Sequence, residues 1–252
     1  MHLSGNTILV TGGTSGIGRA LAGRLHARGN EVIVAGRRQD LLDEFVEVCP
    51  GMHGIRVDVA DPHDLRSFAE EVAGRFPRLN VLVNNAGISR TQDLAAGVAD
   101  LPTTRSIVET NIMSVVTLTA ELLPVLTRNA DPVIMATTSG LAFVPRASFP
   151  TYCASKAFLH SWLQSLRSQL RPAGVEVVEL VPPYVRTELA GPAQSVDPAA
   201  MPLAEYADEV MSILERDGAV DGEVLVERVK ALRMAERDGT YRAIYAGLNG
   251  ET

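Results

Sequence analysis

Short apolar segments alternate with helical patterns along most of this 252-residue chain. The apolar segments have the length of strands and lack polar alternation, which is typical of strands buried on both faces of a sheet. Helical stretches between them would cover those faces, as in repeated βαβ units. The predicted strands span residues 7–10, 31–35, 55–57, 81–83, 133–136, 175–181 and 223–226. The pattern therefore predicts an α/β fold with a doubly wound parallel sheet.

Helices are predicted over residues 17–28, 41–48, 103–126 and 152–170, with a helical tail over 228–248. A further helix is expected to begin at Asp61-Pro62, because Asp caps helix N-termini and Pro suits the first helical position. Residues 190–202 are rich in Ala, Pro, Gly and Ser and form the least regular stretch. Since no low-complexity linker divides the chain, we expect residues 1–252 to form a single domain with a flexible excursion at this stretch.

Charge and apolar run lengths restrict the class of protein. The chain has 23 basic and 30 acidic side chains, a net charge of −7, so we expect it to bind neither nucleic acid nor an anionic membrane surface. No apolar run approaches the roughly 20 residues of a membrane span, and no secretory signal is visible. Cys49 and Cys153 form no CxxC pair, and the five His are scattered. A cytoplasmic protein without a metal site is therefore expected.

A glycine-rich loop, TGGTSGIG over residues 11–18, joins the first predicted strand to the first helix. Glycines at such a turn let a pyrophosphate approach the main chain, and the N–H groups at the helix start attract the anion. Arg19 and Ala20 follow the loop, which excludes a Walker motif, and the spacing also departs from G-x-G-x-x-G. A plain strand–helix turn stays open as an alternative. The residues expected to bind a dinucleotide here are Gly12, Thr14, Ser15, Gly16, Ile17 and Gly18.

The second predicted strand ends at Gly36 and is followed by Arg37 and Arg38. NAD enzymes of this fold place an acid near this point to bind the ribose 2′-hydroxyl, whereas a 2′-phosphate requires guanidinium groups. We therefore expect NADP(H) to be preferred, with NAD(H) possible and Arg37 the stronger candidate by position. Two solvated loop arginines are the alternative. Asp58, after the third strand, is placed to reach an adenine amine or to serve a structural turn.

Tyr152 and Lys156 lie four residues apart in a predicted helix and so share one of its faces. Because the pKa of a free phenol lies near 10, acid–base work at neutral pH needs a neighbouring ammonium to lower it. With 5 Tyr and 2 Lys in the chain, random placement yields this spacing roughly 0.04 times, which disfavours a merely packed Tyr beside a solvated Lys. Ser139 lies upstream, just past the end of a predicted strand, where active sites form in such sheets.

Four motifs occur together, namely Thr11-Gly12-x3-Gly16-x-Gly18, Asn84-Asn85-Ala86-Gly87, Ser139 and Tyr152-x3-Lys156. In this order and spacing they resemble the short-chain dehydrogenase/reductase family over about residues 5–190. The resemblance implies a Rossmann-like sheet of about seven strands and a nicotinamide cofactor. It also implies reversible hydride transfer between NADP(H) and a carbonyl or secondary alcohol.

The family's catalytic roles carry over onto matching residues. Tyr152 would be the general acid or base, Ser139 would orient the reacting oxygen, and Lys156 would hold the nicotinamide ribose and lower the pKa of Tyr152. Asn111 matches the family's asparagine, which kinks a helix and supports a proton-relay water. On residue grounds alone, Asn111 would be an amide satisfied inside a helix. The family often carries two adjacent serines before the catalytic helix, and Thr138 takes the first place here, so Ser139 is the catalytic candidate.

The resemblance also implies further cofactor contacts and a substrate lid over residues 188–202. Pro183 departs from the family's frequent Pro-Gly and lacks a backbone donor, which weakens the expected contacts from Val185 and Thr187 to the nicotinamide amide. Asn84 would simply fix the end of a strand. The cofactor contacts, besides the glycine loop and the two arginines, are expected at Asp58, Val59, Asn85, Ala86, Gly87, Tyr152, Lys156, Pro182, Val185 and Thr187.

The substrate is expected to be a small carbonyl or alcohol compound. Apolar residues near the expected site entrance would bind neutral groups, or would instead serve packing or an oligomer contact; they are Leu141, Phe143, Val144, Phe149 and Leu189. Family habit implies a homodimer or homotetramer. The C-terminal tail is similar to that of a poorly characterised branch of oxidoreductases, some encoded with lipoteichoic-acid D-alanylation genes.

Two other classes are weighed against this prediction. A non-catalytic NADP-sensing regulator would keep the glycine loop but has no need of Ser139, Tyr152, Lys156 and Asn111 together. A sugar-nucleotide epimerase or dehydratase shares the Tyr–Lys pair but typically shows T-G-x2-G-x2-G and a longer substrate domain. The glycine spacing and the chain length therefore favour the dehydrogenase/reductase.

Overall fold

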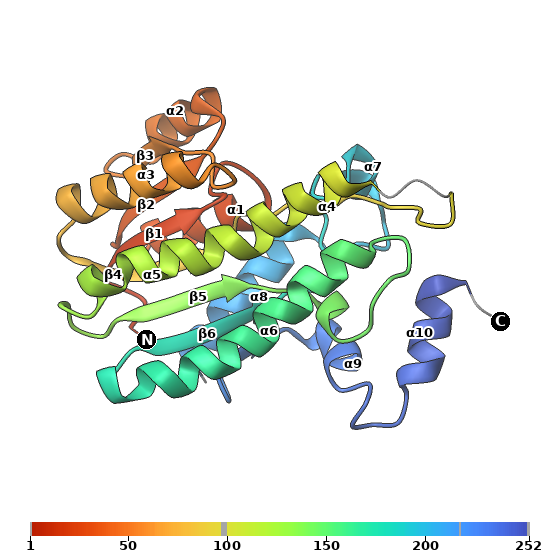
Figure 1. The fold of residues 1–252 in the computed structure, drawn as a ribbon. Helices are drawn as coiled ribbons and strands as arrows, with labels where there is room; N and C mark the ends of the chain where they lie inside the picture. Colours follow the sequence, from red (N-terminus) through yellow and green to blue (C-terminus); the bar gives the residue numbers. More distant parts are fainter. Residues whose placement is uncertain (1, 97–99, 217, 251–252) are drawn as a thin grey trace.

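A seven-stranded parallel sheet organises the chain, in the strand order β3-β2-β1-β4-β5-β6-β7 (Figure 1). The computed structural model describes residues 2–96, 100–216 and 218–250. All six strand pairings are parallel, so the predicted doubly wound sheet is confirmed together with each predicted strand. The strands are β1 (Thr7–Thr11), β2 (Glu31–Gly36), β3 (His53–Arg56), β4 (Leu79–Asn84), β5 (Val133–Thr137), β6 (Glu176–Val181) and β7 (Glu223–Leu225).

Helices cover both faces of the sheet and divide the core into two layers (Figure 1). Helices α1 (Gly16–His26), α2 (Gln39–Val48) and α8 (Leu203–Arg216) pack on one face. Helices α3 (Pro62–Arg75), α5 (Ser114–Leu126) and α6 (Pro150–Leu170) pack on the other. Successive strand residues enter opposite layers, as Val10 and Leu9 do, which explains why the strands read as apolar runs without alternation.

Helix boundaries follow the predicted signals closely. The Asp61 carboxylate accepts hydrogen bonds from the backbone N–H groups of His63 and Asp64, and Pro62 is the first residue of α3, as expected. The predicted helix over residues 103–126 is one helical stretch in three parts, α4 (Leu101–Val108), the π-helical segment η1 (Glu109–Met113) and α5. A short 3-10 turn, η3 (Arg171–Ala173), ends α6 before Gly174 adopts a left-handed conformation.

The stretch Leu101–Leu126 is also long and apolar enough, by length and composition, to cross a membrane. The expectation from the sequence that no apolar run approaches the length of a membrane span did not anticipate this stretch. One such helix is weak evidence for a span, because the core helix of a folded domain passes the same test. Here Leu118, Leu122 and Leu126 are buried in the layer between the sheet and α3 and α6.

Three regions after residue 188 differ from the sequence-based prediction. Helix α8 was not predicted, although its buried residues recur at helical spacing from Tyr206 to Leu214. The least regular stretch contains a short helix, α7 (Pro192–Val196). The tail is interrupted instead of forming one helix, because Gly239 has a positive φ in the turn that separates two helical parts. Those parts are η4 (Glu227–Val229) with α9 (Lys230–Arg233), and α10 (Tyr241–Asn249).

Candidate active site

The glycine loop packs directly on the loop that follows β4, where the strand order reverses between β1 and β4. The Thr11 hydroxyl accepts hydrogen bonds from the backbone N–H groups of Asn85 (3.0 Å) and Ala86 (3.1 Å), and the Asn85 side chain donates to the Thr11 carbonyl (3.1 Å). A Cβ added at Gly12 would lie 2.9 Å from the Ala86 Cα, and one at Gly18 would overlap the Gly12 carbonyl oxygen. These glycines are therefore required by close backbone contact, at the place where dinucleotides bind in this fold.

The first turn of α1 is open to an anion. The hydroxyl of Ser15, the N-cap residue, does not accept a hydrogen bond from the backbone N–H groups of the first turn, and no acidic residue lies in that turn. Gly16 has a φ of 55°, and a Cβ there would lie 3.5 Å from the Thr187 methyl group, so the segment after β6 borders the loop. The N–H groups at the helix start, the helix dipole and the lack of an acidic residue in the first turn of α1 fit a pyrophosphate at this turn.

The two arginines after β2 are placed differently. The Arg38 guanidinium donates to the Ser15 hydroxyl (2.8 Å) and lies 3.3 Å from the Thr14 hydroxyl, so it reaches over the glycine loop. Arg37 is exposed and, within the described part of the chain, makes no hydrogen bond or ion pair. Position in the sequence favoured Arg37, whereas the structure brings Arg38 to the loop.

The remaining residues expected around the adenosine are mostly engaged in local structure. One carboxylate oxygen of Asp58 accepts from the Ala60 N–H (3.1 Å), which supports the turn before α3. Val59 packs against the core layer that contains α3 and α5. The Asn84 side chain donates to the Thr119 hydroxyl (3.1 Å) and fixes the end of β4, as expected for a structural asparagine.

Ser139, Tyr152 and Lys156 converge at the carboxyl end of β5. The Lys156 ammonium donates to the Thr137 carbonyl (2.8 Å) and lies 5.8 Å from the centroid of the Tyr152 ring. The Ser139 side chain is hydrogen-bonded with Tyr152, and its oxygen also accepts from the Leu141 N–H (3.1 Å). All three side chains are buried. The structure thus brings together the three residues that the sequence singled out.

Burial dominates the electrostatics of this group. Desolvation raises the pKa of Tyr152 to about 12, against an opposing effect of the hydrogen bond with Ser139. Desolvation also lowers the pKa of Lys156 to about 8. The net shift of the Tyr152 pKa is therefore upward, with Lys156 not among its causes, and the lowering expected from Lys156 stays a prediction. The physical reason is that both groups lose their water, which disfavours the phenolate and the ammonium alike.

Asn111 lies in the π-helical segment η1 and is fully buried. Its amide oxygen accepts from the Ile88 N–H (2.9 Å), and its amide nitrogen donates to the Ile88 carbonyl (3.0 Å) and to the Ser155 hydroxyl (3.0 Å). These bonds tie the loop after β4 to α6. A Cβ at Gly87 would lie 3.6 Å from the Lys156 ammonium nitrogen, so this loop borders the catalytic group.

The segment after β6 is pinned by Gln194 of α7, a residue that the sequence analysis did not single out. Its amide donates to the Val185 carbonyl (2.7 Å) and to the Thr187 hydroxyl (3.2 Å). The Val185 side chain is buried in the core, and its backbone carbonyl is the group that binds Gln194. The Pro182 carbonyl accepts from the Gly140 N–H (2.9 Å) and thereby joins the segment to the turn after Ser139.

Two of the five apolar residues expected at the site entrance serve packing. Val144 is fully buried, and the Phe143 ring lies edge-on to His160 (4.7 Å between centroids) and beneath the Arg233 guanidinium (4.7 Å). Leu141 and Phe149 are half-buried, and Leu189 is exposed. These last three stay candidates for substrate contact.

The fold, the glycine loop and the Ser–Tyr–Lys group together define a nicotinamide-dependent dehydrogenase or reductase. The family model described as short chain dehydrogenase matches residues 6–197. The chain belongs to the short-chain dehydrogenase/reductase family, as an oxidoreductase acting on CH–OH or C=O groups.

Particular relatives refine this assignment. The chain is 39% identical over 251 residues to the uncharacterized oxidoreductase DltE of Bacillus subtilis (strain 168), covering 99% of this chain and 98% of that protein. A short-chain dehydrogenase from Sphingobium yanoikuyae in complex with NADPH is 25% identical, with a TM-score of 0.80 over 96% of this chain and 95% of that chain.

A second solved structure is 3-ketoacyl-(acyl-carrier-protein) reductase from Brucella melitensis, complexed with NADH. It is 25% identical, with a TM-score of 0.77 over 89% of this chain and 97% of that chain. The first neighbour holds NADPH and the second holds NADH, which lacks the ribose 2′-phosphate. A nicotinamide cofactor is therefore supported for this chain, without a choice between the two forms.

Proposed function

We propose that the chain catalyses reversible hydride transfer between NADP(H) and a carbonyl compound or secondary alcohol. The observation that carries the proposal is the convergence of Ser139, Tyr152 and Lys156 beside a loop built for a pyrophosphate. In the reductive direction, NADPH held at this loop would supply a hydride to the carbonyl carbon, and a proton must reach the carbonyl oxygen. A ketone or aldehyde, NADPH and a proton thus give the alcohol and NADP⁺.

The protein's own residues would perform the proton transfer and the orientation. Tyr152 donates its phenolic proton to the substrate oxygen, and its pKa of about 12 keeps the phenol in the protonated, donating form at neutral pH. The Ser139 hydroxyl orients the same oxygen. Lys156, held by the Thr137 carbonyl, would hold the nicotinamide ribose and stabilise the phenolate left after proton transfer. Asn111 would support a water that returns the proton.

The preference for NADP(H) is part of the proposal. Arg38 is already held over Ser15 at the pyrophosphate turn, and Arg37 is exposed beside it, so both guanidinium groups are available to a ribose 2′-phosphate. The last residue of β2 is Gly36, so the strand end offers no carboxylate to a 2′-hydroxyl. The segment over residues 188–202 would act as the substrate lid, with Gln194 accepting from the Ala190 N–H and joining the segment to the Val185 carbonyl.

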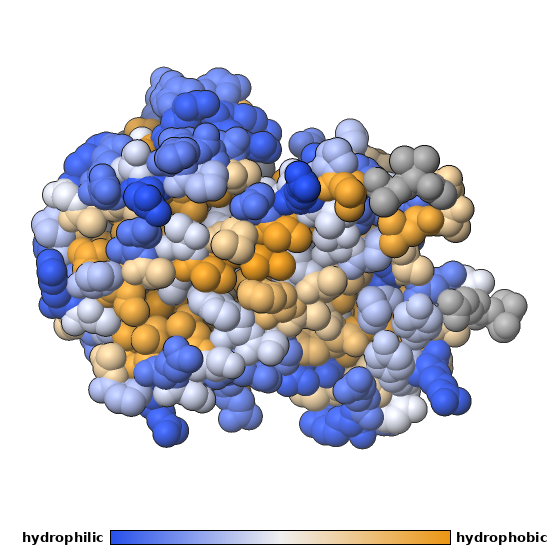
Figure 2. Space-filling model, viewed as in Figure 1, coloured by the Kyte–Doolittle hydropathy of each residue, from blue (hydrophilic) through white to orange (hydrophobic). Residues whose placement is uncertain are grey.

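The same proposal includes a cytoplasmic homo-oligomer. Apolar side chains gather on the face formed by the α4–α5 stretch and α6 (Figure 2). Leu101, Met113 and Phe158 are large, exposed and apolar along these helices. A contiguous apolar face of this kind supports contact with a second copy.

The proposal is tested with a panel of aldehydes, ketones and secondary alcohols, followed by NADPH absorbance. Tyr152→Phe is expected to lower kcat by about 10²–10⁴-fold, because the proton donor is lost. Tyr206→Phe is the matched control, since Tyr206 is a fully buried phenol in α8 whose hydroxyl finds no partner among the described residues. Full turnover by Tyr152→Phe on an active substrate would contradict the mechanism.

A further inference from the structure

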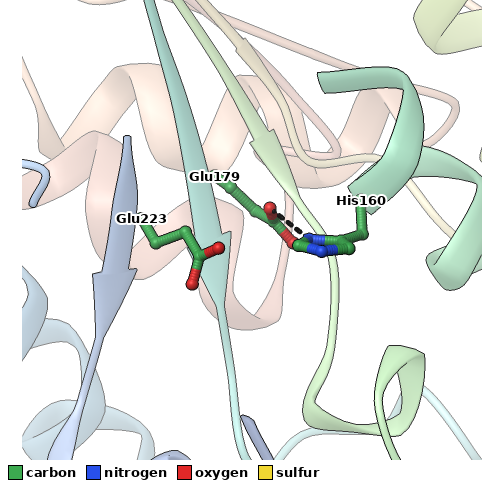
Figure 3. Close-up of side chains that lie close together, drawn as sticks. All are labelled: His160, Glu179 and Glu223. Carbon is green, nitrogen blue, oxygen red and sulfur yellow. Dashed lines mark hydrogen bonds and ion pairs between the residues drawn. The ribbon is translucent and has the colours of Figure 1, made fainter. Parts of the chain in front are cut away.

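A buried polar cluster lies on the outer strands of the sheet, and Figure 3 shows three of its members, His160, Glu179 and Glu223. Glu179 of β6 and Glu223 of β7 are register partners, and the side chain of Glu179 is completely buried. His160 of α6 bonds to one Glu179 oxygen (2.8 Å), and Thr138 bonds to the other (2.7 Å). Arg233 of α9 binds both oxygens of Glu223 (2.7 and 2.9 Å). We call these five residues the Glu179 cluster.

The polar groups of the Glu179 cluster find their hydrogen-bond and charge partners within the cluster. His160, Glu179 and Glu223 offer ligand atoms within 4.8 Å of one another, the arrangement of a candidate metal site. However, a metal ion would have to displace the Arg233 guanidinium from Glu223. That guanidinium is held firmly, because its hydrogen bonds with Glu223, together with the charges of Glu223 and Glu179, raise the pKa of Arg233 against the opposing effect of burial. The cluster therefore has its counter-charge and needs another explanation.

The hydrogen-bond directions in the cluster follow from its chemistry. An ionised Glu179 only accepts, so the Thr138 hydroxyl and the Nδ1–H of His160 each donate to it. The other ring nitrogen of His160 then accepts from the Gln164 amide (3.1 Å). The Thr138 bond, at 2.7 Å to a buried carboxylate, has the length of a charge-assisted hydrogen bond. A buried threonine is thus fixed in one orientation immediately before Ser139.

The hydrogen bond from Thr138 to Glu179 affects the direction of the Ser139 side chain because the backbone is extended at Ser139. Ser139 has φ −170° and ψ 153°, and the Thr138 N–H continues the β5–β6 ladder to the Leu180 carbonyl (2.9 Å). Successive side chains of an extended chain point to opposite sides. With Thr138 held toward Glu179 and His160, the Ser139 hydroxyl projects from the other side of the chain and is hydrogen-bonded with Tyr152, two turns before His160 at the start of α6.

The same cluster holds the chain on the other side of Ser139. The turn η2 (Gly140–Ala142) leads to Phe143, whose ring contacts both His160 and Arg233. A Cβ at Gly140 would lie 2.6 Å from the Leu232 side chain, so the turn also packs closely on α9. The C-terminal segment is thereby joined to the turn that carries the catalytic serine.

The catalytic helix joins the cluster through its own periodicity. Tyr152, Lys156 and His160 follow one another at intervals of four residues and so form one stripe on α6. Lys156 binds the carbonyl of Thr137, and His160 reaches Thr138 through Glu179. The end of β5 and the stripe on α6 are therefore held in one fixed relation.

We propose that Thr138 and Glu179 are positioning residues that aim the Ser139 hydroxyl at the reacting oxygen, with Arg233 of the C-terminal segment completing their support. The inference rests on the proposed function, because it gives Ser139 a substrate oxygen to orient. A positioning residue acts through its neighbour, so its loss should lower kcat without weakening the binding of NADPH.

The test compares two threonines that donate to glutamates at opposite ends of the sheet. Thr138→Val removes the hydroxyl at the cluster, and Thr7→Val removes the one that donates to Glu31 (2.9 Å) at the amino end of β1. On whichever panel substrate the wild-type chain turns over, Thr138→Val is expected to lower kcat about tenfold, with NADPH affinity unchanged within twofold. Thr138→Ser restores the hydroxyl and is expected to recover kcat within about threefold.

A double-variant cycle tests whether Thr138 acts through Ser139. In a Ser139→Ala background, Thr138→Val is expected to lower kcat by less than about twofold, because the group to be aimed is gone. Glu179→Gln keeps the volume but leaves one acceptor oxygen for two donors, and is expected to reproduce the loss in kcat. Equal losses for Thr138→Val and Thr7→Val, or an undiminished tenfold loss in the Ser139→Ala background, would overturn the proposal.

A measurement without substrate separates this inference from the proposed function. Hydrogen–deuterium exchange over residues 139–144 is expected to quicken at least threefold in Thr138→Val and to stay unchanged in Thr7→Val. If the wild type turns over no compound of the panel, the proposed function fails, whereas unchanged exchange in Thr138→Val overturns the positioning role by itself.

Discussion

Replacing Gly18 by Ala tests whether close backbone contact is the reason that this position needs a glycine. The added Cβ would overlap the Gly12 carbonyl oxygen and the Asn85 amide, and would lie 2.9 Å from the Gly12 carbonyl carbon. Such overpacking costs about 3 kcal/mol at the upper end of its usual range when backbone must move. The higher helix propensity of Ala stabilises the folded chain by about 1 kcal/mol relative to Gly. A net loss of about 2 kcal/mol is therefore expected.

Gly23→Ala in the same helix is the matched control. Its Cβ would lie 3.8 Å from the Phe45 ring, an ordinary van der Waals contact, so only the gain in propensity of about 1 kcal/mol remains. The two variants should then differ by about 3 kcal/mol, which corresponds to roughly 6–12 °C in Tm for a domain of this size. Thermal melts measure the difference, and NADPH fluorescence should show at least a tenfold weaker Kd for Gly18→Ala alone. Melting temperatures within about 2 °C of each other, with equal Kd values, would refute the reasoning.

Two further predictions concern charge. Between pH 8 and 10.5 the unfolded chain binds a proton at Lys156 that the folded chain has released, so the wild type should gain stability relative to Lys156→Met as pH rises through this window. The gain is on the order of 3 kcal/mol at most, measured by urea unfolding at both ends of the window, and a difference independent of pH would contradict the cause given for the shift. Arg38→Ala and Arg37→Ala should each lower the ratio of kcat/KM for NADPH over NADH by about 10–100-fold, from the loss of a charged hydrogen bond. If neither steady-state ratio moves, the proposed preference for NADP(H) is wrong.

Much of the site could be predicted from the sequence because its parts are local in the chain. The glycine loop lies within residues 11–18, and the spacing of Tyr152 and Lys156 places them on one face of a helix whatever surrounds them. The strand that ends before Ser139 places that residue at the carboxyl edge of the sheet. Each of these inferences depends on a short interval along the chain.

Other features depend on distant contacts. Gln194 lies in a stretch that the sequence marks as irregular, yet it pins the Val185 carbonyl. Helix α8 has a clear apolar stripe, but the sequence around it carries no motif, so this helix was not predicted. Arg38, and not Arg37, reaches the glycine loop because the backbone turn at the start of α2 decides which side chain points there.

By itself, the sequence determined the strands, the helices up to residue 170, the family and the catalytic candidates, because periodicity and motif spacing are properties of short segments. The tertiary structure decided the electrostatics and the support of the site. The pKa of Tyr152 rises although a lysine lies one helical turn away, because burial is set by elements from the whole chain. The Glu179 cluster likewise draws residues 138, 160, 179, 223 and 233 together across two strands and two helices. Distances of that kind follow from the packing of the sheet, and no local pattern in the chain encodes them.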